Sequence, residues 1–133
     1  MSQIRPAIAS FSLGAPATFP LPDRLRLAQQ HGFKGIELFY GDLTTYTGNQ
    51  RFNGNLLKAA EHIRQICDEL DLTIVTLQPF RFYEALVDCH EKESILATKL
   101  PLWRRLARIL CAEMILVLSN YLNEDPTLGK EEW

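Results

Sequence analysis

A chain of 133 residues that is 47% hydrophobic and 23% charged has the composition of a packed globular domain, which excludes a disordered chain. Its 14 basic and 16 acidic residues give a net charge of -2, so it carries no basic field that would hold nucleic acid. No run approaches 18 apolar residues, the N-terminus lacks the apolar core of a secretory signal, and the cysteines are odd in number without CxxC spacing. We therefore expect a cytoplasmic protein with no membrane segment.

The sequence of the first half of the chain predicts two strands, each followed by a polar connection. A strand over residues 6–13 ends where prolines begin, and Asp23 is placed to cap a helix that continues to Gln30. A second strand is predicted over residues 35–40. The polar stretch 41–55 is long enough to be a loop that faces substrate.

The second half repeats the pattern with clearer helices. Apolar residues at spacings of three and four predict one helix from Leu56, Ala60, Ile63, Cys67 and Leu70, and another from Leu96, Leu100, Trp103, Ala107 and Leu110. Pro101 lies inside the second helix and predicts a kink or a restart there. Strands are predicted over residues 73–77 and 114–118, and residues 123–133 show no periodicity.

Four strand-helix units in succession predict a parallel α/β sheet. Eight such units close a (β/α)8 TIM barrel in about 250 residues, so this chain is expected to form a half-barrel. The expected division is a half-barrel over residues 1–122 and a frayed polar tail over 123–133. Such a half leaves strand edges uncovered, and these edges favour self-association.

In a parallel barrel the chemistry lies at the carboxyl ends of the strands, and four residues there are candidates for binding substrate. They are Glu37, Gln78, Arg81 and Asn120. A lone carboxylate inside an apolar strand is costly, so Glu37 is either paired, with Arg5, Arg81 or backbone donors, or functional. The guanidinium of Arg81 suits a substrate carboxylate.

Structural alternatives remain open for several of these residues. Arg81 lies three residues before Glu84, which is the spacing of a surface ion pair. Asn120 is of a residue type that is common in turns. Asp42 is suited either to bind substrate hydroxyls or to stabilise the loop. His62 is expected to face solvent, and no histidine has a second ligand at the spacing of a metal site, so no metal-binding residue is predicted.

Three segments carry a resemblance to a known family: AIASFSLG at the start, KGIELFYGDL over residues 34–43 and TLQPFRFYE over residues 76–84. They resemble the 3-dehydroshikimate dehydratases, which belong to the xylose isomerase-like barrels, and the resemblance extends from about Ile4 to Leu122. The run from Gln78 to Arg81, with Glu84 after it, is the most specific part.

The resemblance implies a lyase that converts 3-dehydroshikimate, a small hydroxy acid, to protocatechuate in quinate and shikimate catabolism. The family uses a divalent metal such as magnesium, manganese or cobalt, and its ligands and general base come from the second half of the barrel. The chain therefore looks like the N-terminal half of such an enzyme, with Arg81 as the carboxylate clamp and Glu37, Gln78 and Asn120 lining the mouth. We expect it to bind no metal and to be inactive alone. The alternatives are a sugar phosphate isomerase or epimerase of the same superfamily and a non-catalytic half-barrel that dimerises.

Overall fold

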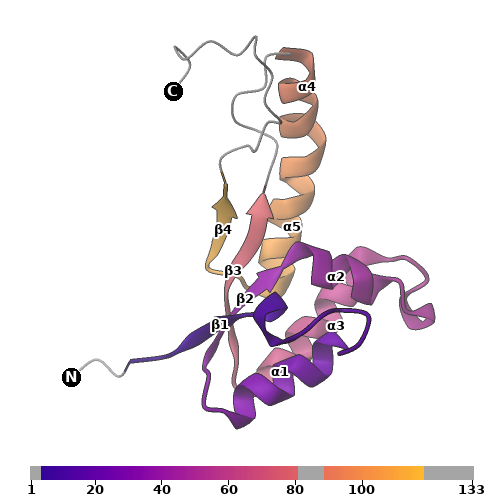
Figure 1. Cartoon of the computed structure of the whole chain (residues 1–133). Coiled ribbons are helices and arrows are strands. Elements are labelled where there is room, and N and C mark those ends of the chain that lie inside the picture. Colours follow the sequence, from indigo (N-terminus) through magenta and orange to yellow (C-terminus); the bar gives the residue numbers. More distant parts are fainter. Residues whose placement is uncertain (1–3, 81–88, 119–133) are drawn as a thin grey trace, which may run out of the picture.

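In the computed structural model, four parallel strands form one sheet in the order β1-β2-β3-β4 (Figure 1). The structure describes residues 4–80 and 89–118. The strands are β1 (Ala7–Ala9), β2 (Gly35–Phe39), β3 (Thr73–Phe80) and β4 (Met114–Val117). This arrangement confirms the predicted parallel α/β sheet. The predicted tail, 123–133, lies outside the described residues.

Helices α1 (Leu21–Gln30), α3 (Leu56–Glu69) and α5 (Leu100–Leu110) connect the strands. Helix α3 packs against α1 and against α5, so the three form one layer over the sheet (Figure 1). A shorter helix, α4 (Cys89–Ser94), continues through the π-helical turn η3 (Ile95–Lys99) into α5. No helix in the described ranges is long and apolar enough to cross a bilayer.

The core lies between this helical layer and one face of the sheet. Ile36 and Leu38 of β2 are fully buried there, as are Ala60, Ile63 and Cys67 of α3. The apolar spacing of α3 therefore predicted its buried face correctly. Burial raises the pKa of the Cys67 thiol to about 12, which is what desolvation does to a group that must become charged.

Strands β1 and β2 approach each other closely at Gly35. A Cβ atom at this position would lie 2.8 Å from both the Ala7 Cβ and the Val75 Cγ2 atoms. Glycine is therefore required here because the neighbouring side chains occupy the space that a Cβ would need.

Several predicted boundaries were wrong, and each error has a local cause. The first strand stops at Ala9 and gives way to a 3-10 turn, η1 (Ser10–Leu13). Helix α1 begins at Leu21 with Pro22 in its first turn, so Asp23 lies within that turn and is not its cap. The helix predicted over Leu96–Leu110 does not restart at Pro101, because the π-helical turn η3 passes directly into α5 with Pro101 in its first turn, and Leu96 is exposed.

The largest correction concerns residues 41–55, which were expected to form a loop. They contain helix α2 (Tyr40–Thr47) and the 3-10 turn η2 (Gln50–Phe52). Leu43 on α2 is fully buried, and the Thr47 hydroxyl donates to the Leu43 carbonyl oxygen 2.8 Å away. The segment is helical because it packs on the core, although its own sequence is polar.

Candidate functional site

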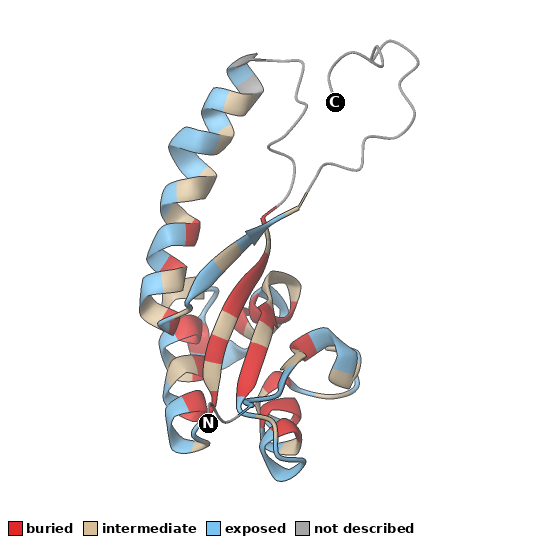
Figure 2. Ribbon diagram, turned by 90° about the vertical axis from the view of Figure 1, so that its left-hand side faces the viewer, coloured by how far each residue is buried: buried red, intermediate tan, exposed pale blue. Residues whose placement is uncertain are grey.

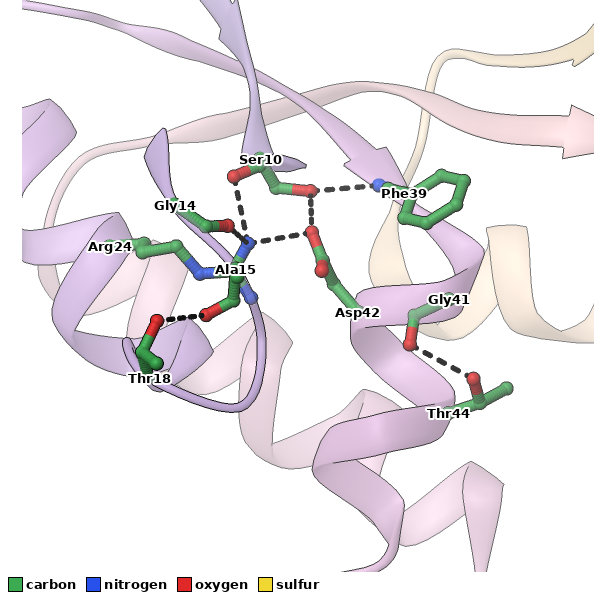
Figure 3. Close-up of polar contacts among 9 residues, drawn as sticks. All are labelled: Ser10, Gly14, Ala15, Thr18, Arg24, Phe39, Gly41, Asp42 and Thr44. Atoms are coloured by element: carbon green, nitrogen blue, oxygen red, sulfur yellow. Dashed lines mark hydrogen bonds and ion pairs between the residues drawn. The ribbon is translucent and has the colours of Figure 1, made fainter. Parts of the chain in front are cut away.

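A buried polar network joins the carboxyl ends of β1 and β2 (Figure 3). The Ser10 hydroxyl donates to Oδ2 of Asp42, 2.7 Å away, and accepts from the Phe39 backbone N–H at 2.9 Å. Nη1 of Arg24 lies 2.9 Å from the same Asp42 oxygen, 2.9 Å from the Ser10 carbonyl oxygen and 3.2 Å from that of Gly14. The Arg24 and Asp42 side chains are both 0% exposed.

This network fixes the geometry of the strand ends. Arg24 lies on α1, Asp42 lies on α2, and Ser10 begins the turn η1 directly after β1. Three elements therefore meet at one ion pair. Nε and Nη2 of Arg24 and Oδ1 of Asp42 have no hydrogen-bond partner among the residues described. Burying such a pair with unsatisfied atoms is expensive, so the pair is better understood as a device that specifies geometry than as a net source of stability. The Asp42 carboxylate is thus engaged in structural contacts with Ser10 and Arg24.

Sequence reasoning missed Arg24. The available signal was its position on the apolar face of α1, because Leu21, Leu25 and Ala28 at helical spacing from it are all buried. An arginine on such a face needs a buried acceptor, and Asp42 provides it from 18 residues away.

Two of the predicted substrate-binding residues lie on the face of the sheet that is turned away from the helices. Residues alternate along a strand, so Glu37 projects opposite to its buried neighbours Ile36 and Leu38. In the ladder between β2 and β3, Glu37 is paired with Thr76 and Phe39 with Gln78, which places Glu37 and Gln78 on one face of adjacent strands. Glu37 is half-buried and Gln78 is 8% exposed.

The remaining two candidates, Arg81 and Asn120, lie outside the described residues. Strand β3, which was predicted to stop at residue 77, continues to Phe80 and so places Arg81 directly after its carboxyl end in sequence. Within the described ranges the Glu37 side chain forms no hydrogen bond or ion pair, and Arg5 is not paired with it.

An aromatic cluster lies beside the carboxyl ends of β2 and β3. The Trp103 ring stacks on Tyr40 with centroids 4.7 Å apart and meets Phe80 edge-on at 5.3 Å. The Lys99 ammonium lies 4.9 Å from the centroid of the Phe80 ring. Burial lowers the pKa of Lys99 and raises the pKa of Tyr40, since each charged form is less well solvated there.

The prediction that His62 faces solvent was wrong. Its Nδ1 atom lies 2.7 Å from the Tyr46 hydroxyl, and its ring packs beside Tyr46 and Phe52. The pKa of His62 is lowered by desolvation first and then by the positive charge of Arg51, while Glu69 opposes both effects.

The described side chains do not form a metal-binding set. No group of three or more His, Cys, Asp or Glu side chains able to hold an ion occurs within residues 4–80 and 89–118. Asp42, the other carboxylate near the strand ends, already accepts from Ser10 and Arg24. The side chains that the structure describes therefore do not fit a divalent cation by themselves.

The fold matches that of solved barrels. The chain superposes with a TM-score of 0.72 and 27% identity on a xylose isomerase-like TIM barrel/4-hydroxyphenylpyruvate dioxygenase fusion protein, covering 91% of this chain and 17% of that one. AsbF from Bacillus anthracis, a probable 3-DHS dehydratase, superposes with a TM-score of 0.59 at 16% identity, covering 97% of this chain and 43% of that one, and supports the fold alone. The chain is thus part of a xylose isomerase-like TIM barrel.

Curated relatives similar in sequence to this chain carry one name. The chain is 40% identical over 126 residues to the 3-dehydroshikimate dehydratase of Neurospora crassa, a match that covers 87% of this chain and 35% of the relative. It is 35% identical over 78 residues to the enzyme of the same name from Pseudomonas putida, covering 59% and 10%. No protein-family model matches the sequence. The chain is thus similar to 3-dehydroshikimate dehydratases over most of its own length and spans about a third of the length of its Neurospora relative.

Proposed function

We propose that this chain is a partial 3-dehydroshikimate dehydratase that carries substrate-binding groups of the site but not its metal-binding groups. The 40% identity to the Neurospora dehydratase over most of the chain is the observation that supports this proposal most strongly. The parent reaction is the metal-dependent dehydration of 3-dehydroshikimate to protocatechuate. A divalent metal such as magnesium, manganese or cobalt, held by groups that the described residues do not provide, would supply Lewis-acid chemistry to this reaction.

The chain's own groups bind and orient the substrate in this proposal. On the face of the sheet that is turned away from the helices, Gln78 of β3 offers both a donor and an acceptor. Glu37 of β2 offers acceptors on the same face, two residues farther from the carboxyl ends of the strands. Arg81 holds the substrate carboxylate through its planar pair of donors, and Asn120 hydrogen-bonds at the same mouth. Because Glu37 has no described cationic partner, it remains available to accept from a substrate hydroxyl.

Substrate binding and turnover test different parts of the proposal. Titration of the 133-residue chain with 3-dehydroshikimate, followed by calorimetry, is expected to show saturable binding that Arg81→Ala weakens at least tenfold, while Arg51→Ala leaves it unchanged. Incubation with Mg²⁺, Mn²⁺ or Co²⁺ is expected to release no protocatechuate above the uncatalysed rate. Turnover at a normal enzymatic rate, or binding insensitive to Arg81→Ala, would overturn the proposal, and preference for a neutral sugar would favour an isomerase or epimerase.

Two further features belong to the same proposal. The described thiols Cys67 and Cys111 are both free, which supports a reducing, cytoplasmic location. The exposed strand β4 supports self-association through the edges of the partial barrel (Figure 2).

A further inference from the structure

A pocket of about 320 Å³ lies beside the buried ion pair of Arg24 and Asp42. Its walls come from the segment 14–20, from the start of α1, and from α2 with the residues that follow it. All of the lining residues are described by the structure, and none belongs to the edge strands β1 and β4. The pocket is therefore formed within the described part of the chain and not at the free edges of the sheet.

The ion pair presents one donor and one acceptor to this pocket. Nη2 of Arg24 and Oδ1 of Asp42 lie on the side of the pair that is turned away from Ser10 (Figure 3). Both atoms are buried, and neither makes a hydrogen bond to the described residues. A buried polar atom that stays unpaired carries the full cost of its lost hydration. A ligand that pairs with both atoms at once removes that cost.

The charges of the pair favour a neutral ligand. Arg24 and Asp42 lie 2.9 Å apart, so their opposite charges compensate each other and leave little net charge to attract an ion. A group that only accepts would leave Oδ1 unpaired, and a group that only donates would leave Nη2 unpaired. A hydroxyl group satisfies both atoms, because its oxygen accepts from Nη2 while its proton is donated to Oδ1.

The remaining walls suit a small molecule with several hydroxyl groups. Pro16, Pro20 and Leu21 provide an apolar side for carbon-bound hydrogen atoms. Thr45 and Asn49, which are exposed, provide polar groups for further hydroxyls. A volume of about 320 Å³ lies near the lower end of the range for ligand pockets, so the ligand must be small.

A ligand reaches the ion pair when the segment 14–20 shifts outward, because both charged side chains are 0% exposed. The backbone hydrogen bonds of this segment are local, since the N–H groups of Thr18 and Phe19 both donate to the Ala15 carbonyl oxygen. Its first carbonyl oxygen accepts from Nη1 of Arg24 at 3.2 Å, the longest of the three contacts of that atom. The segment can therefore open while α1 and α2 stay in place.

We propose that this pocket binds a small neutral polyol, one hydroxyl of which bridges Nη2 of Arg24 and Oδ1 of Asp42. The inference goes beyond the proposed dehydratase function, because none of the four residues proposed to bind that substrate lines the pocket. The two proposals also have separate readouts. Loss of 3-dehydroshikimate binding would leave the polyol site in place, and the reverse holds as well.

Titration of the isotope-labelled chain with glycerol, followed by two-dimensional NMR, tests the site directly. We expect saturable shifts in the millimolar range at the side-chain N–H signals of Arg24 and at the backbone amides of Thr45 and Asn49. Acetate, which only accepts, and methylammonium, which only donates, are expected to leave these signals in place. Saturation by acetate would indicate an anion site, and unchanged signals in glycerol would indicate a site for water alone. Either outcome would overturn the proposal.

Two neighbouring threonines of α2 provide a matched pair of variants. Thr44 and Thr45 are both exposed, and only Thr45 lines the pocket. Thr45→Phe is expected to weaken glycerol binding about tenfold because the larger side chain occupies pocket volume, and Thr44→Phe is expected to leave it unchanged. Equal affinities for the two variants would place the glycerol somewhere else on the molecule.

Asp42→Asn tests the charge argument. The amide oxygen can still accept from Ser10 and Arg24, while the amide nitrogen replaces Oδ1 beside the pocket and the charge of Arg24 is no longer compensated. The preference is therefore expected to change from glycerol to acetate. A variant that is folded by circular dichroism and still prefers glycerol would contradict the proposal. If the variant does not fold, the threonine pair decides the question by itself.

Discussion

Replacing Arg24 by methionine is expected to destabilise the chain far more than the same replacement two residues later in α1. Nη1 of Arg24 donates to three oxygens, those of Ser10, Gly14 and Asp42, at 2.9, 3.2 and 2.9 Å, and its side chain is 0% exposed. Arg26 forms a 2.8 Å ion pair with Asp23, but these two side chains are 53% and 51% exposed. Both arginines thus lie on α1 and each pairs with an aspartate, Arg24 with Asp42 and Arg26 with Asp23, but only the first pair is buried.

The size of each effect follows from that difference. Arg24→Met leaves the Asp42 carboxylate as a buried charge whose remaining donor is the Ser10 hydroxyl, and breaking a buried pair in this way costs about 3–5 kcal/mol. Arg26→Met removes an exposed pair and is expected to cost no more than about 1 kcal/mol. Total stabilities of single domains are about 5–15 kcal/mol, so only the first variant should approach global unfolding.

Urea unfolding followed by circular dichroism measures both free energies of unfolding. The expected result is a large fall in the midpoint for Arg24→Met and almost none for Arg26→Met. Equal midpoints for the two variants, or a cost below about 1 kcal/mol at Arg24, would refute the view that the buried pair organises the strand ends.

Three further results are expected. Peptide mapping after alkylation at neutral pH should find Cys111 modified and Cys67 protected until the chain unfolds, because burial raises the pKa of Cys67 to about 12; equal labelling would contradict this. A proton NMR titration should give His62 a pKa below 6.5, so that folding loses stability as the pH falls below 6.5 and the unfolded chain binds the proton more readily, and Arg51→Gln should raise that pKa. Gly35→Ala should cost about 1–3 kcal/mol in thermal unfolding, because its Cβ would meet two side-chain atoms at 2.8 Å, and an unchanged Tm would show that β1 moves aside freely.

The elements that the sequence predicted well are those whose signal is local. The stripe of α3 was correct at Ala60, Ile63 and Cys67 because helical spacing alone determines which side chains share a face. The parallel order of strands followed from alternation of strand and helix, which allows few topologies.

The errors occur where distant residues decide the outcome. The α2 segment looks polar, and its burial depends on Arg24 and Ser10, which lie 18 and 32 residues from Asp42 in sequence. The shortening of β1 has the same origin, since Ser10 leaves the ladder to bond the Phe39 N–H and Asp42. Glu37 and Gln78 could be selected as candidates from the sequence because polar groups near the end of an apolar strand stand out without any knowledge of their neighbours.

The order in which the strands are added has a consequence for synthesis. Among the residues that the structure describes, each strand pairs with the strands next to it in sequence, so every new strand and helix can dock onto the part already made as it leaves the ribosome. A gene for such a sheet can be extended at its 3′ end by whole strand-helix units, and the strand order of the part encoded before them stays the same.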